Sequence, residues 1–206
     1  MNYIQVGASN GLSHGKPDGF FTYIQERDIH KDDRIILVEP NSLLTPTLKE
    51  NWSEYSNNIE IYEYGIVPKE LSGKLLKLFW HPDDGPHHQL SSFNPYHLIK
   101  HHREWSVEDL SIMNVPSITL EYLIENTVKD EPIEMLALDI EGIDAEVLFD
   151  IDYSRLNVHY LSFEAVHLGI HKEKILSRLR EENFSYVGEG LDPHGYDLMY
   201  IKERFI

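Results

Sequence analysis

Two carboxylates and a glycine follow an apolar stretch in the second half of the chain. The run Leu136–Leu138 predicts a buried strand, and Asp139, Glu141 and Gly142 come directly after it. Ligands of open α/β sheets bind at the carboxyl ends of the strands, so these side chains are placed where a ligand would lie. Carboxylates at such a position can accept protons from a substrate, and the segment therefore indicates an enzyme.

Two further predicted strands end in glycine or acidic residues. Residues 3–6 lead into Gly7 and Gly11, and residues 35–38 lead into Glu39. The glycines allow a tight turn and a close approach of a ligand, and Glu39 can accept hydrogen bonds from a ribose diol. This pattern favours a nucleoside site. The spacing Gly-x-x-x-Gly departs from the dinucleotide motif, so a purely structural turn, with Glu39 capping the next helix, stays open as an alternative.

Strand-like runs alternate with helical patterns along most of the chain. The predicted parallel strands are residues 3–6, 35–39, 59–64, 135–139 and 160–164. Apolar spacing predicts helices around Phe20 and Ile175, and the runs 184–187 and 196–201 predict an antiparallel pair. The sequence therefore predicts an α/β fold with a Rossmann-like, doubly wound, mostly parallel sheet and an antiparallel C-terminal edge pair.

One segment, residues 81–116, breaks this alternation and is rich in His, Pro, Asp and Ser. We expect a long excursion over the active face of a single domain that spans residues 1–206. The metal-competent residues in it are His81, Asp83, Asp84, His87, His88, His97, His101 and His102. No His-Glu-x-x-His or comparable spacing is apparent, so we expect a solvated, pH-sensitive loop and no metal. The neighbouring aromatic residues predict a small satellite core or a surface for stacking an acceptor: Trp80, Phe93, Tyr96 and Trp105.

Composition argues against several classes of protein. A formal net charge of -17 without a Lys/Arg cluster opposes binding to nucleic acid. The absence of cysteine excludes disulfides and thiolate chemistry, and no apolar run reaches the roughly 20 residues of a membrane span. The first residues do not resemble a secretory signal, and we therefore expect a soluble, cytoplasmic enzyme.

Several motifs, in order, resemble those of the FkbM-type methyltransferases, a family of class I O-methyltransferases that depend on S-adenosylmethionine. Residues 5–11 are similar to the family's Asp/Gln-Val-Gly-Ala-Asn-x-Gly opening, and residues 138–142 to its Ile-Asp-x-Glu-Gly signature. Further similarity lies at residues 38–40, 117–120, 146–148, 151–153 and 163–168. The chain departs from the family at Ser9, which is usually Asn, and at Gln5, which is Asp in many members.

The resemblance implies a class I methyltransferase fold and S-adenosylmethionine as the cofactor. It places Gly7, Ala8 and Gly11 along the methionine portion and Glu39 at the ribose hydroxyls. The residues expected to bind the cofactor are Gly7, Ala8, Ser9, Asn10, Gly11, Glu39, Pro40, Ser91, Ser92 and Asp139. The expected reaction is O-methylation of a hydroxyl on a small molecule or a carbohydrate.

An alcohol is a poor nucleophile at neutral pH, so a base should remove its proton as the methyl group transfers. The candidates are Asp139, Glu141, Glu164 and His167, of which we favour Asp139 first and His167 second. Alternatively, Glu141 or Glu146 caps the following helix or forms a salt bridge with it, and His167 only orients Glu164.

Two other functions stay open. The departure at Ser9 is compatible with a non-catalytic module that binds S-adenosylmethionine or another nucleoside. The carboxylates and the His-rich segment are compatible with a metal-assisted hydrolase. Because the chain starts almost at the first strand, we expect no separate N-terminal lid, and homo-oligomerisation is one way to complete the pocket. The identity of the acceptor is not encoded in these motifs.

Overall fold

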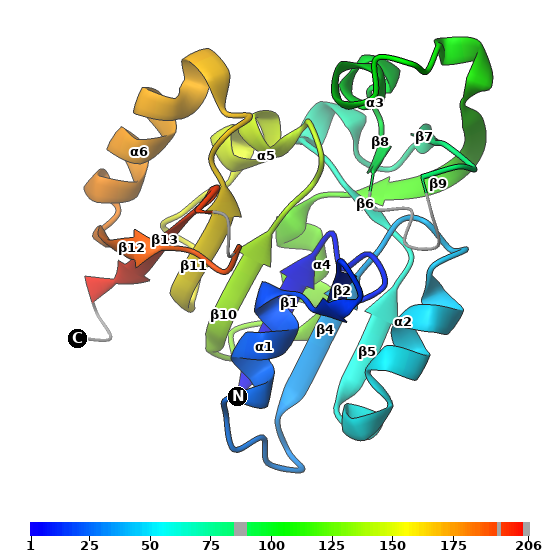
Figure 1. Cartoon of the computed structure of the whole chain (residues 1–206). Coiled ribbons are helices and arrows are strands. Elements are labelled where there is room, and N and C mark those ends of the chain that lie inside the picture. The colour runs from blue at the N-terminus through cyan, green and yellow to red at the C-terminus, as the bar shows by residue number, and fades with distance from the viewer. Residues whose placement is uncertain (85–89, 193–194, 204–206) are drawn as a thin grey trace.

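A seven-stranded sheet forms the centre of the computed structural model, which describes residues 1–84, 90–192 and 195–203 (Figure 1). Its strand order is β12-β13-β11-β10-β1-β4-β5. The strands are β1 (Asn2–Val6), β4 (Arg34–Val38), β5 (Ile59–Tyr62), β10 (Ile133–Leu138), β11 (Val158–Glu164), β12 (Phe184–Glu189) and β13 (Asp197–Lys202). β13 inserts between β11 and β12 and runs antiparallel to both, whereas the other pairs are parallel. The predicted mostly parallel sheet with an antiparallel pair at one edge is confirmed.

Helices cover both faces of this sheet (Figure 1). Alternate residues of β1 show why, since Tyr3 packs with α1 (Gly19–Gln25) and α2 (Thr45–Asn51), while Ile4 packs on the opposite face. The helices on that opposite face are α4 (Leu120–Thr127), α5 (Asp144–Asp150) and α6 (Lys172–Glu181). Both layers pack against the sheet through buried apolar residues. Among the described residues, no helix has the length and hydropathy needed to cross a membrane.

The excursion is larger and more ordered than the sequence predicted. A second sheet, in the order β6-β9-β7-β8, begins before residue 81, and α3 (Pro95–His101) lies beside it (Figure 1). Its strands are β6 (Gly65–Ile66), β7 (Leu75–Trp80), β8 (Ser91–Ser92) and β9 (Ser111–Ile118). The last residues of the predicted excursion, 111–116, belong to a strand, since β9 runs antiparallel to β7 with Pro116 opposite Leu75 and Ser111 opposite Trp80. Strands of this kind are hard to recognise in the sequence, because their exposed face mixes apolar residues such as Ile112 with polar ones.

Short elements complete the connections. A two-stranded ribbon, β2 (Leu12–Ser13) with β3 (Lys16–Pro17), follows the first glycine turn. The 3-10 helices are η1 (Ser53–Tyr55), η2 (Lys69–Leu71), η3 (Val107–Asp109) and η4 (Gly169–His171). The ribbon and the second sheet both lie near the carboxyl ends of the central strands, where the pocket opens.

Candidate active site

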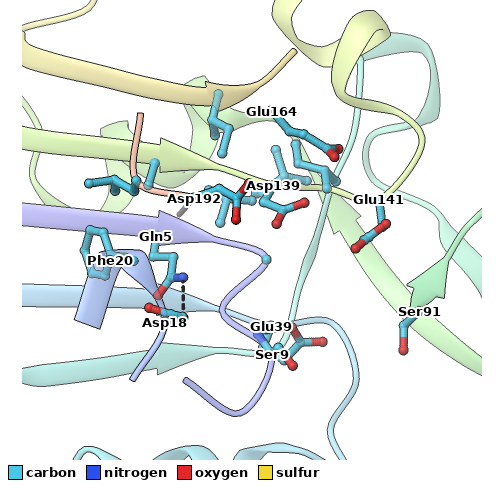
Figure 2. Close-up of a pocket in the computed structure, with 18 of the residues that line it drawn as sticks. Gln5, Ser9, Asp18, Phe20, Glu39, Ser91, Asp139, Glu141, Glu164 and Asp192 are labelled. Carbon is cyan, nitrogen blue, oxygen red and sulfur yellow. Dashed lines mark hydrogen bonds between the residues drawn. The ribbon is translucent and has the colours of Figure 1, made fainter. Parts of the chain in front are cut away.

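A pocket of about 260 Å³ opens at the carboxyl ends of β1, β4 and β10 (Figure 2). The chain reaches β4 and β5 on one side of β1, and β10 and β11 on the other, so β1 and β10 flank the point where the strand order reverses. Open α/β sheets bind their ligands at this switch point. The acidic residues that line the pocket are Asp18, Glu39, Asp139, Glu141, Glu164, Asp192 and Asp197.

Gly7 makes the turn at the end of β1 and has no room for a side chain. Its φ is +81°, and a Cβ at this position would lie 1.7 Å from the carbonyl oxygen of Asp139. The amides of Gly7 and Ala8 both donate to the carbonyl oxygen of Val38, at 2.9 and 3.0 Å. The turn therefore ties the ends of β1, β4 and β10 together at the floor of the pocket.

Substituting Gly7 tests this close approach. Gly7→Ala should lower the free energy of unfolding by about 3 kcal/mol or more, because left-handed strain adds to a steric overlap with backbone. Gly15→Ala is the matched control, since Gly15 also has a positive φ of +75° but a Cβ there meets nothing within 4 Å. Urea denaturation of both variants gives the comparison, and equal losses would contradict the steric explanation.

Glu39 is held at the end of β4 by two backbone amides. Ser9 N–H donates to its Oε2 at 2.8 Å, and Asn41 N–H donates to its Oε1 at 2.7 Å. The residue is only 4% exposed, and burial, together with the nearby Glu141, raises its pKa to about 7 against the two hydrogen bonds. Each oxygen keeps a lone pair, so Glu39 can still accept a hydrogen bond from a ligand in the pocket.

The raised pKa of Glu39 predicts that the stability of the ligand-free protein depends on pH. The folded state retains this proton up to about pH 7, while the unfolded chain loses it near 4.5. The free energy of unfolding should therefore fall by about 3 kcal/mol, through this group alone, as the pH rises from about 4.5 to above 7. The free energy of unfolding across this range measures the effect. Glu39→Gln carries no titrating group and should show a shallower slope; an unchanged slope would exclude Glu39 as the cause.

The loop after β10 is shaped by Asp144, a residue that the sequence analysis did not single out. Its carboxylate accepts hydrogen bonds from the amides of Ile140, at 2.8 Å, and Gly142, at 3.2 Å. Burial raises its pKa to about 6, partly offset by the Ile140 bond. The missed signal is an acidic residue at the start of the helix that follows Glu141 and Gly142. Neither Glu141 nor Glu146 makes these loop contacts.

Asp139 follows β10 directly, and its side chain is exposed to the pocket (Figure 2). Desolvation by the surrounding protein raises its pKa well above the usual value, and the charges of Glu141 and Asp144 add to this. A carboxylate with a raised pKa is a stronger base than an ordinary aspartate.

Gln5 and Asp18 also face the pocket, and the sequence analysis did not assign them to the site. Gln5 Nε2 donates to Asp18 Oδ2 at 3.0 Å, and Asp18 Oδ1 accepts from the amide of Phe21 at the start of α1 (Figure 2). Burial raises the pKa of Asp18. Gln5 Oε1 is buried and makes no hydrogen bond within the described residues. The signal was Gln5 itself, a polar residue inside an otherwise apolar strand.

Glu164 lines the pocket from the end of β11, whereas His167 does not. Glu164 Oε2 is buried without a hydrogen-bond partner in the described parts of the chain, and burial, followed by Asp144 and Glu141, raises its pKa to about 8. His167 Nε2 lies 3.7 Å from Glu164 Oε1. Of the four predicted base candidates, Asp139, Glu141 and Glu164 line the pocket. His167 lies outside the lining, next to Glu164.

The predicted cofactor residues divide into a lining set and a supporting set. Those that line the pocket are Gly7, Ser9, Glu39, Pro40, Ser91 and Asp139, whereas Ala8, Asn10, Gly11 and Ser92 lie outside its lining. Two of the supporting residues have a clear structural role. Ser92 Oγ donates to the carbonyl oxygen of Glu141 at 2.6 Å, and Asn10 Oδ1 accepts from the amide of Leu12 at 3.0 Å.

The aromatic and histidine residues of the excursion lie in different parts of the structure. Phe93 lines the pocket, while Trp105 stacks on His81 and His102 with ring centroids 4.0 and 3.8 Å apart. His87 and His88 lie outside the described residues. His97 and His101 stand four residues apart on α3, a spacing that the sequence analysis overlooked.

The strand order, the glycine turn and the acidic end of β4 define a class I methyltransferase fold. The sequence model of the family described as "Methyltransferase FkbM domain" matches residues 5–186, and the chain belongs to that family. No curated protein matches the sequence. A solved structure of methyltransferase FkbM from Methylobacillus flagellatus KT is similar, with 14% identity and a TM-score of 0.51, over 97% of this chain and 43% of that chain.

More distant similarity extends to other solved methyltransferase structures. An S-adenosylmethionine-dependent O-methyltransferase from Thermotoga maritima is 9% identical, with a TM-score of 0.46, over 98% of this chain and 58% of that chain. Fibrillarin from Aeropyrum pernix, solved with natively bound S-adenosyl-L-methionine, is 10% identical, with a TM-score of 0.44, over 97% of this chain and 66% of that chain. This chain thus spans less than two thirds of the length of each of these proteins.

Proposed function

We propose that the protein binds S-adenosylmethionine in the acidic pocket and methylates a hydroxyl oxygen of a small molecule or a carbohydrate. The observation that carries the proposal is the lining of the pocket, where carboxylates gather at the switch point of the sheet. Membership of the FkbM methyltransferase family supports the same reaction class.

The chemistry of the lining fits this cofactor. S-adenosylmethionine carries a sulfonium and an ammonium group, and positive charge stabilises nearby ionised carboxylates. Gln5 Oε1 and Glu164 Oε2 are buried acceptors without a hydrogen-bond partner among the described residues, and both residues line the pocket. An ammonium group offers three donors for acceptors of this kind.

Within the proposal, each part of the chain has a role in binding. Glu39, fixed by Ser9 and Asn41, accepts hydrogen bonds from the ribose hydroxyls through its remaining lone pairs. Ser91 and Phe93 bring the second sheet to the same pocket and help to exclude water. When bound, the cofactor supplies an electrophilic methyl carbon on its sulfonium.

Asp139 takes the proton of the acceptor hydroxyl in this proposal. It is open to the pocket at the end of β10, and its raised pKa makes its ionised form a stronger base than an ordinary aspartate. Glu141 and Glu164 line the same pocket, where their negative charges raise the pKa of Asp139 and attract a cationic cofactor. Positioning of the acceptor oxygen about 3 Å from the methyl carbon would supply most of the remaining rate enhancement.

Calorimetric titration with S-adenosylmethionine and S-adenosylhomocysteine tests the proposal. We expect a single binding site with micromolar affinity. We also expect methylated product when hydroxylated small molecules and sugars are screened by mass spectrometry for the gain of one methyl group. Tight binding without product in a broad screen would favour a non-catalytic binding module. Absence of binding to either compound would overturn the proposed cofactor.

A further inference from the structure

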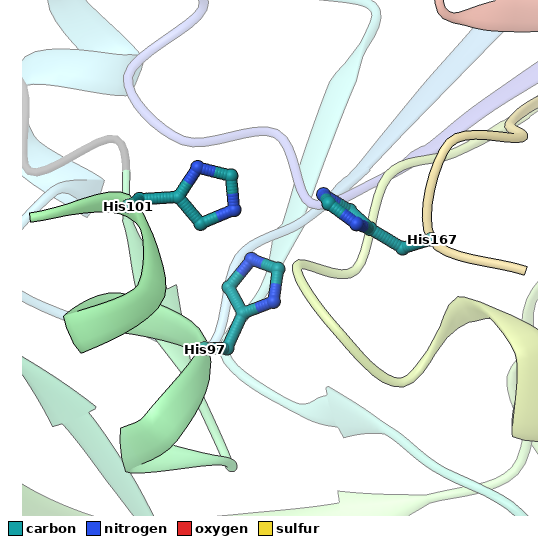
Figure 3. Close-up of side chains that lie close together, drawn as sticks. All are labelled: His97, His101 and His167. Carbon is teal, nitrogen blue, oxygen red and sulfur yellow. The ribbon is translucent and has the colours of Figure 1, made fainter. Parts of the chain in front are cut away.

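Three histidine rings meet beside the acidic pocket, outside its lining (Figure 3). His97 and His101 project from α3, one helical turn apart, and His167 lies in the loop that follows β11. One ring nitrogen of each residue lies within 4.8 Å of the other two. The excursion and the central sheet thus supply one cluster of nitrogen ligands.

The separation of the rings matches that of imidazoles around a metal ion. The ring centroids of His97 and His101 are 4.7 Å apart, those of His97 and His167 are 4.9 Å apart, and those of His101 and His167 are 5.4 Å apart. Tetrahedral coordination with metal–nitrogen bonds of about 2.0–2.1 Å places ring centroids about 5 Å apart. Small rotations of the side chains are therefore enough to bring three nitrogens onto one ion.

Hydrogen bonding between the rings does not explain the cluster. Within the described residues, no hydrogen bond joins any two of the three rings. The polar neighbours are carboxylates instead, since Glu141 Oε2 lies 2.9 Å from His97 Nε2 and Glu164 Oε1 lies 3.7 Å from His167 Nε2. Anionic groups next to histidine ligands are the usual outer partners of a metal site, where they orient the rings and balance the charge.

We propose that His97, His101 and His167 bind a divalent transition-metal ion, for which zinc is the best-matched probe. Three imidazoles leave a fourth position open for water, and Glu141 holds the His97 ring from its other nitrogen, Nε2. The bound ion ties α3 to the loop after β11 and holds Glu141 and Glu164 at the wall of the pocket. This site does not depend on the proposed cofactor, and it departs from the metal-free loop that the sequence predicted.

Zinc titration of chelator-treated protein without a histidine tag, in the absence of S-adenosylmethionine, tests the site. Competition with a chromophoric chelator should give one zinc ion per chain with a dissociation constant in the micromolar range or below. Cobalt should produce the visible absorption bands of a four-coordinate site. His101→Ala should weaken zinc binding at least about tenfold, because it removes a ligand from a site where even an outer partner contributes that much.

A matched control keeps the test specific. His159→Ala removes a histidine near the amino end of β11, far along the strand from Glu164, where it contacts Glu134. This variant should bind zinc as the wild type does. His101 is exposed, so its replacement should leave the fold intact, as circular dichroism can verify. Zinc should raise the melting temperature of the wild type more than that of His101→Ala. A wild type that binds no zinc, or equal affinity in the wild type and His101→Ala, would overturn the proposal.

Discussion

Replacing Asp139 by asparagine should lower turnover by about 10²–10⁴-fold and leave the affinity for S-adenosylmethionine within a few-fold of the wild type. Asparagine has nearly the same shape but cannot take a proton from the acceptor hydroxyl. The raised pKa of Asp139 also predicts that wild-type turnover increases with pH as this carboxyl ionises. That increase should be absent in Asp139→Asn. Single-turnover rates across a pH series, with binding measured by calorimetry, give both results.

The control for this experiment is Glu134→Gln. Glu134 lies on the same strand, β10, but towards its amino end, where it contacts His159 and takes no part in the pocket. It should have wild-type turnover. Full activity in Asp139→Asn would exclude Asp139 as the base and would direct attention to Glu164, whose pKa is raised to about 8 by burial and by neighbouring carboxylates.

Replacing Glu39 by alanine should weaken the binding of S-adenosylmethionine at least about 100-fold, which corresponds to about 3 kcal/mol. The substitution removes the proposed partner of the ribose and also releases the amides of Ser9 and Asn41, which position the turn. S-adenosylhomocysteine has the same ribose, so its affinity should fall by a similar factor. Calorimetry with both compounds measures the two losses.

Two comparisons separate ribose binding from a general loss of structure. Glu60→Gln removes an acidic residue on β5 that pairs with Arg34 outside the pocket, and it should not change cofactor affinity. A 2′-deoxy analogue of the cofactor should bind the wild type weakly but should lose little further affinity in Glu39→Ala. Equal affinities of the wild type and Glu39→Ala for S-adenosylmethionine would contradict the role of Glu39.

The central sheet was predictable because its strands are buried and their patterns are local. Ile4 and Val6 pack on one layer of helices and Tyr3 on the other, so β1 is apolar on both faces and easily recognised. By contrast, β7 and β9 are partly exposed and mix apolar and polar residues on the exposed face, and Pro116 lies within β9. Their pairing depends on contacts between distant segments, which periodicity does not reveal.

Candidate site residues were predictable where they end a buried strand, as at Gly7, Glu39, Asp139 and Glu164. The positions of these residues follow directly from the strands that carry them. Asp144 was missed because its carboxylate folds back onto the loop between strand and helix, a contact that the residue type alone does not specify. The prediction that His167 is a base candidate is untested, and the structure places it outside the pocket lining.

The sequence by itself determined the fold class, the family and the strand ends that form the pocket, because apolar periodicity and turn glycines act over a few residues. Only the tertiary structure decided which polar side chains share a wall of the pocket and which stand behind it. The three histidines illustrate the difference, since α3 and the loop after β11 are far apart in the sequence and meet only when the excursion packs against the central sheet. Such encounters depend on the packing of whole elements, which no short segment encodes.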